Sequence, residues 1–138
     1  MKKYRVLLGF ILISMSLLLQ GCSNTKTLEC DFIDNAGFLE KQILEYKNDK
    51  LYSYEIIYSY DFNYLDENID NNELNICDSI MEDESVMSCV QKTDDKTFKV
   101  ETKLDINKAN KDILKQLNDI KKTKETFENN SKATCEIK

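Results

Sequence analysis

The chain has 138 residues, with 19 Lys and Arg against 25 Asp and Glu, so its formal net charge is −6. This acidic balance argues against nucleic acid as a partner, because the phosphates require a basic surface. Histidine is absent, so neither a Ser-His-Asp nor a Cys-His catalytic arrangement can be built.

Residues 1–21 have the form of an export signal. Three basic residues among the first five precede a mostly apolar stretch over 6–19, which is shorter than the roughly 20 residues that a membrane-spanning helix needs. The stretch ends in Leu19-Gln20-Gly21-Cys22, which resembles the lipobox of bacterial lipoproteins. The resemblance implies cleavage between Gly21 and Cys22 and a diacylglycerol on the Cys22 sulfur. A secreted protein, or an uncleaved anchor, with a chance cysteine is the alternative.

Lipidation would anchor the chain on the extracytoplasmic face of the cell membrane, since two acyl chains give stable attachment. Removal of residues 1–21 takes away three positive charges and changes the net charge from −6 to −9. We therefore expect the acyl chains, and not attraction to anionic lipid, to hold the protein. The predicted parts are a signal over 1–21, a lipidated cysteine with a short tether over 22–26, and one domain over 27–138.

Three antiparallel strands are predicted at the start of this domain. Residues 27–34 and 38–46 form the first two strands, and 35–37 and 47–50 form turns. The third strand, 51–60, places its tyrosines on one face at a period of two, together with Ile56. Such a row favours a half-buried strand under helices, and an exposed row would be an interaction surface for a glycan, a peptide or a protein. Its candidate residues are Tyr52, Tyr54, Tyr58 and Tyr60.

The next segment is acidic and has a looser, helical spacing of apolar residues. Residues 51–91 contain ten Asp and Glu and no Lys or Arg, and one or two short helices are predicted between 61 and 91. Residues 66–77 fail as a calcium-binding EF-hand loop, because Asn71 replaces the required Gly and Cys77 replaces the bidentate Glu. A weak divalent-cation site of Asp66, Asp70 and Glu73 remains an alternative to a solvated acidic surface.

The C-terminal part predicts a strand, a helix and a last strand. Residues 97–106 alternate strictly, Asn107 is the expected cap of the next helix, and 134–138 form a short final strand. The expected helical stripe is Ala109, Ile113, Leu117 and Ile120. The predicted fold class is α+β, an antiparallel sheet in the order β-β-β-α-β-α-β with helices packed on one face.

The four cysteines other than Cys22 indicate a disulfide-stapled exported domain. Four cysteines allow three pairings, and the sequence does not choose among them. We favour Cys30–Cys135, which joins the first and last strands, and Cys77–Cys89, which clips a short helical hairpin. A zinc or redox site of the four thiols is the alternative, although no CxxC spacing and no histidine support it.

The chain resembles the small YehR-like lipoproteins of low-GC Gram-positive bacteria. The resemblance rests on the lipobox, the early Cys30, the strand–turn–strand unit over 46–56, the late amphipathic helix and the terminal Thr134-Cys135-Glu136-Ile137-Lys138. The pair Cys77 and Cys89 is not part of that pattern. The resemblance implies a fold and a location, and it implies no activity.

Nothing in the sequence indicates catalysis. The three glycines do not form a phosphate-binding loop, and a carboxylate-dependent cell-wall hydrolase is the remaining enzymatic alternative. We expect a non-enzymatic binding domain at the cell surface whose partner is a protein or another cell-envelope ligand. We expect no cofactor, and the diacylglycerol on Cys22 is the expected covalent group.

Overall fold

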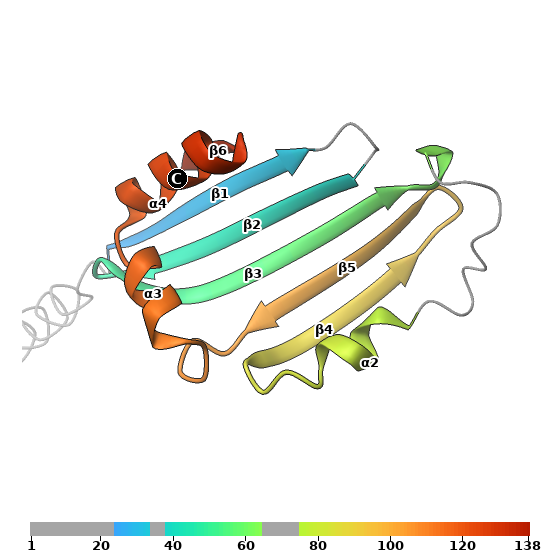
Figure 1. The fold of residues 1–138 in the computed structure, drawn as a ribbon, viewed down its shortest axis with the longest axis horizontal. Coiled ribbons are helices and arrows are strands. Elements are labelled where there is room, and N and C mark those ends of the chain that lie inside the picture. The colour runs from blue at the N-terminus through green and yellow to red at the C-terminus, as the bar shows by residue number, and fades with distance from the viewer. Residues whose placement is uncertain (1–23, 34–37, 65–74) are drawn as a thin grey trace, which may run out of the picture.

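The structure is a computed structural model that describes residues 24–33, 38–64 and 75–138. The predicted signal and Cys22 lie outside these residues. One antiparallel sheet of six strands has the order β4-β5-β3-β2-β1-β6 (Figure 1). The strands are β1 (Thr25–Ile33), β2 (Phe38–Lys47), β3 (Lys50–Asp61), β4 (Val86–Thr93), β5 (Thr97–Leu104) and β6 (Thr134–Ile137). The helices are η1 (Phe62–Tyr64), α2 (Ile76–Ile80), α3 (Lys111–Leu117) and α4 (Ile120–Ser131).

The predicted antiparallel sheet is confirmed, and its first three strands form the expected meander. β1 begins at Thr25, two residues before the predicted start. The turn between β2 and β3 uses Asn48 and Asp49, both with positive φ, a conformation that Asn and Asp tolerate better than most residues.

The predicted element order is wrong between residues 86 and 91. This segment was expected to be helical, and it forms the edge strand β4, paired with β5. Its apolar residues do not alternate in burial, since Met87 and Val90 are 56% and 46% exposed. A register shift between Val86 and Ser88 interrupts the pairing further. An edge strand with this pattern carries little period-two signal.

The predicted helix after residue 106 is two helices, and its expected cap is wrong. Asn110, and not Asn107, caps α3, because its side chain accepts a hydrogen bond from the N–H of Asp112 at 2.9 Å. Asp119 then caps α4, which begins at Ile120 and ends at Ser131. Ile113, predicted to face the core, is 54% exposed.

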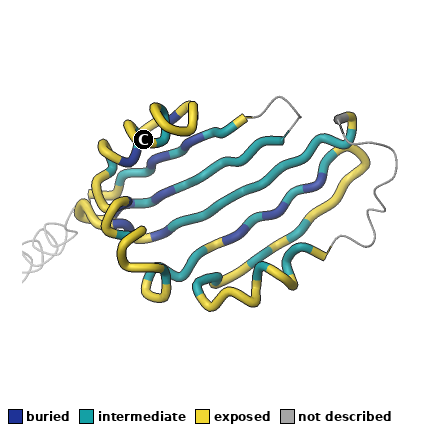
Figure 2. Tube along the Cα trace, viewed as in Figure 1, coloured by how far each residue is buried: buried dark blue, intermediate teal, exposed yellow. Residues whose placement is uncertain are grey.

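The core lies between the sheet and the pair α3–α4, at the end of the sheet where β1 begins (Figures 1 and 2). Leu28 and Leu44 are fully buried there, and Leu117 of α3 is 9% exposed. Phe32 of β1 and Phe127 of α4 meet edge to face, with ring centroids 5.4 Å apart. α3 and α4 cover one end of this face of the sheet, and α2 lies at the other end of the same face.

The opposite face of the sheet carries ion pairs, as is typical of a solvated face of an antiparallel sheet. Lys99 Nζ lies 2.7 Å from Glu101, and Lys138 Nζ lies 2.7 Å from Glu29. Across 24–33, 38–64 and 75–138, no helix is both long and apolar enough to span a bilayer.

Candidate functional site

An open hollow of about 220 Å³ lies on the helix-bearing face, at the end of the sheet away from Thr25. We call it the aromatic hollow. β3 supplies its centre, because Tyr60 pairs with Phe38 of β2 on one side and with Phe98 of β5 on the other. Directly paired residues of an antiparallel sheet point to the same face. The lining residues are Phe38, Tyr58, Tyr60, Ile76, Ile80, Phe98 and Val100.

Three rings of the aromatic hollow form a contiguous group. Phe38 is stacked on Tyr58 with centroids 5.8 Å apart, and it is tilted against Tyr60 at 4.7 Å. Phe98 and Val100, beside them on β5, are buried, whereas Tyr58 and Tyr60 are only half-buried. The ring faces that remain accessible can therefore accept an apolar stem or a cation.

The helix α2 forms one wall of the aromatic hollow through Ile76 and Ile80. Two contacts hold this short helix to β4. The disulfide Cys77–Cys89 joins them with a Cα–Cα distance of 5.5 Å, and the N–H of Ile76 donates to Gln91 Oε1 at 3.0 Å. A five-residue helix is not stable by itself, so we infer that the wall depends on this attachment.

A carboxylate lies beside the ring group. Glu40 pairs with Tyr58 across the strands, and Gln42 Nε2 donates to Glu40 Oε1. Tyr54 Oη in turn donates to Gln42 Oε1 at 2.6 Å. Burial, followed by the negative charge of Glu40, raises the pKa of Tyr54 and of Tyr58. The phenols therefore stay neutral, and Glu40 provides negative charge at the polar end of the site.

The described surroundings on the α2 side add negative charge. Asp78 lies on α2, whose Ile76 and Ile80 line the aromatic hollow. Lys92 of β4 and Lys96, which follows that strand, lie at the same end of the sheet. The aromatic hollow thus combines apolar ring faces with two nearby carboxylates, those of Glu40 and Asp78.

The structure divides the predicted tyrosine row. Tyr54, Tyr58 and Tyr60 share the helix-bearing face, as predicted, and all three are half-buried. The placement of Tyr52 in this row is wrong. A register shift at Glu45 and Tyr46 makes Leu51 the partner of Tyr46, so Tyr52 is left out of the pairing and is 65% exposed.

Both favoured disulfides are present. Cys30 and Cys135 are direct partners across β1 and β6, with a Cα–Cα distance of 4.1 Å. Cys77–Cys89 links a helix to a strand, whereas two helices had been predicted.

The predicted cation-site residues Asp66, Asp70 and Glu73 lie outside the described residues, as does the lipidation site Cys22. Within the parts of the chain that are described, no three His, Cys, Asp or Glu side chains are grouped so that they could hold a metal ion.

Sequence reasoning missed Phe38, Phe98, Glu40 and the α2 wall as parts of one site. The alternation within β2 and β5 already placed the aromatic rings on one face of each strand, and only the strand order could bring them together. Comparison of the chain with protein-family models, with curated proteins and with solved structures found no match.

Proposed function

We propose that this protein is a lipid-anchored, extracytoplasmic binding domain that holds a lysine or arginine side chain of a basic cell-envelope partner in the aromatic hollow. The observation that supports this proposal most directly is the combination of the Phe38, Tyr58 and Tyr60 rings with the Glu40 carboxylate. The anchor is supported by the basic start, the short apolar stretch and the Leu19-Gln20-Gly21-Cys22 sequence.

The size of the aromatic hollow favours a side chain over a large ligand. Its volume of about 220 Å³ is below the roughly 300–1,000 Å³ of sites that enclose drug-sized molecules. A lysine or arginine stem can lie on the ring faces while its charged head stays near water and carboxylates.

Charge complementarity supports a basic partner. Glu40 pairs with Tyr58 of the aromatic hollow, Asp78 lies on the α2 wall, and the chain without residues 1–21 has a net charge of −9. Such a field speeds the encounter with a positively charged partner and weakens with salt. The partner could be a protein or a peptide of the envelope, and the side chain that enters the site defines the chemistry.

The test uses a blocked tri-lysine peptide and its fully acetylated form as the matched control. Ring resonances of Tyr58 and Tyr60 are followed by NMR in the purified protein at low ionic strength. We expect saturable shifts with tri-lysine and none with the acetylated peptide. Glu40→Gln should weaken binding about fivefold, because an exposed charge pair contributes ~1 kcal/mol.

Two tyrosine variants localise the binding. Tyr60→Ala removes a ring from the aromatic hollow and should abolish the saturable shift, whereas Tyr52→Ala changes an exposed tyrosine outside it and should leave binding unchanged. Equal responses of the two variants, or equal shifts with the acetylated peptide, would count against the proposed site. The anchor is tested separately by the intact, non-reduced mass of the membrane-extracted protein, which should begin at Cys22 and include acyl groups.

A further inference from the structure

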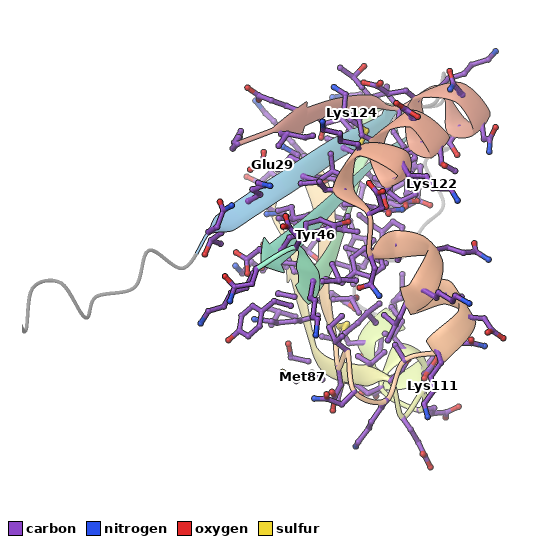
Figure 3. The ribbon with its side chains drawn as sticks, turned by 90° about the vertical axis from the view of Figure 1, so that its left-hand side faces the viewer. Glu29, Tyr46, Met87, Lys111, Lys122 and Lys124 are labelled. Carbon is purple, nitrogen blue, oxygen red and sulfur yellow. A yellow bond between two sulfur atoms is a disulfide. The ribbon has the colours of Figure 1, made fainter. Side chains whose placement is uncertain are left out.

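Four segments meet at the end of the sheet where β1 begins. The N–H of Asn48 donates to the carbonyl of Asn24 at 3.1 Å, and the N–H of Leu51 donates to Asn118 Oδ1 at 3.4 Å. The N–H of Thr27 bonds the carbonyl of Lys138 at 3.0 Å. We call this the basic end, and Figure 3 looks toward it. It comprises residues 24–27, 47–52, 118–122 and 136–138.

The basic end has a charge opposite to that of the whole chain. Its lysines are Lys26, Lys47, Lys50, Lys121, Lys122 and Lys138, and its acidic side chains are Asp49, Asp119 and Glu136. A hollow of about 310 Å³ opens among them and is lined in part by Lys26, Asp49 and Lys121.

All three carboxylates are already engaged, since Glu136 Oε2 lies 3.9 Å from Lys138 Nζ. Asp49 accepts a 3.0 Å hydrogen bond from Lys26 Nζ. Asp119 accepts the backbone N–H groups of Lys121 and Lys122 at 3.0 and 3.1 Å as the cap of α4. Lys50, Lys121 and Lys122 are exposed, and their side chains form no ion pair with any described residue. Their positive charge is therefore available to a partner.

An exposed aromatic residue accompanies these lysines. Tyr52 is 65% exposed, and Lys47 Nζ lies 5.9 Å from the centre of its ring. Tyrosine and lysine together are typical of the boundary between lipid headgroups and water.

We propose that the basic end rests on the anionic headgroups of the membrane that carries the lipid anchor. This inference depends on the proposed lipidation of Cys22. Thr25 follows Cys22 by three residues, so the start of β1 can lie at most about 11 Å from the lipidated residue. That distance is close to the Debye length at physiological salt, within which headgroup charge still acts on lysines.

The contact would orient the domain. β1 runs for nine residues away from the basic end, a length of about 30 Å, and the aromatic hollow lies toward its far end. With the basic end on the headgroups, the hollow lies at the end of the sheet distant from the membrane, where an envelope partner can reach it.

The experiment is amine footprinting of the membrane-extracted protein after reconstitution into vesicles. One set contains phosphatidylcholine alone, and the other contains equal parts of phosphatidylcholine and phosphatidylglycerol. A water-soluble acetylating reagent is applied under single-hit conditions, and each lysine is quantified by mass spectrometry. We expect acetylation of Lys50, Lys121 and Lys122 to fall several-fold with phosphatidylglycerol, and high salt to restore it.

Lys92, Lys96 and Lys132 are the internal control, because they are exposed and lie toward the far end of the sheet. Their acetylation should be the same in both kinds of vesicle. Replacing Lys50, Lys121 and Lys122 by Glu should abolish the lipid-dependent protection of Lys47. The same change at the three control positions alters the net charge equally and should preserve that protection. Equal acetylation of basic-end and control lysines in both vesicles would overturn the inference.

Failure of the anchor gives a different result. The intact mass identifies a chain that lacks acyl groups, and such a chain does not float with phosphatidylcholine vesicles. An acylated chain that floats with both vesicles and shows no lipid-dependent protection rejects the contact of the basic end alone.

Discussion

The phenol of Tyr46 donates a 2.7 Å hydrogen bond to the backbone carbonyl of Leu117, although 71 residues separate them in the chain. Tyr46 lies on β2 and is 1% exposed, and Leu117 is the last residue of α3. The bond therefore ties the sheet to the end of a short helix. Thr123 Oγ1, 3.3 Å from the same carbonyl, brings α4 to this junction.

Tyr46→Phe should lower the free energy of unfolding by about 1 kcal/mol, because it removes one buried hydrogen bond and keeps the ring. Urea unfolding of the purified protein measures the change. Tyr52→Phe, at an exposed position, is the control and should have no effect. A similar loss in both variants would show that the junction adds no stability.

Asp119→Ala should cost about 1 kcal/mol, since the Asp119 side chain caps two N–H groups at the start of α4. Glu125→Ala changes an exposed carboxylate within the same helix and should be close to neutral. Urea unfolding compares the two variants. Hydrogen exchange of the first turn of α4 provides a local readout, and it should quicken in the Asp119 variant only.

The two disulfides should differ in their effect on global stability. Cys30 and Cys135 are separated by 105 residues, and the chain-entropy model gives about 4–5 kcal/mol for such a loop. The loop between Cys77 and Cys89 spans 12 residues and gives about 3 kcal/mol at most. Paired Cys→Ala variants, compared by urea unfolding, should follow this order. Loss of the second bridge should also speed hydrogen exchange in α2 and weaken tri-lysine binding, while loss of the first should leave the α2 wall in place.

Alkaline pH should destabilise the fold. Burial raises the pKa of Tyr46, Tyr54 and Tyr58 above the ordinary value of 10.0. A group whose pKa is raised by folding contributes its full stability below its unfolded pKa, and that contribution is lost as the pH rises further. The urea concentration at the midpoint of unfolding should therefore decrease as the pH rises above about 10. Tyr54→Phe should make this decline shallower, and Tyr52→Phe should leave it unchanged. An identical decline in both would assign it to other groups.

Much of the sheet follows from local alternation, and the rest depends on partners distant in sequence. The strict alternation from Thr97 to Leu104 identified β5, and local patterns also identified β1, β2 and β3. β4 was missed because an edge strand can expose Met87 and Val90, which removes the period-two signal. Tyr52 was misplaced because an extra residue opposite Tyr46 changes the alternation, and only the pairing with β2 reveals it.

The candidate site shows the same division. The tyrosines of β3 were recognised as a set with two possible roles. Their neighbours Phe38 and Phe98 became part of the site only through the order β5-β3-β2. The α2 wall could not be derived, because a five-residue helix has too few residues for a clear periodic pattern and is positioned by a disulfide.

The strand order has a consequence for how occupancy of the aromatic hollow would propagate. Among the described strands, β4 pairs only with β5, so the unit formed by α2, β4 and β5 pairs with the N-terminal meander along the seam between β3 and β5. The hollow is lined from both sides of that seam, by Tyr58 and Tyr60 on one side and by Phe98 and Ile80 on the other. A bound side chain would contact both parts of the sheet and would stabilise their association. Ligand binding could then be detected far from the hollow, as slower opening of the backbone hydrogen bonds along the whole seam between β3 and β5.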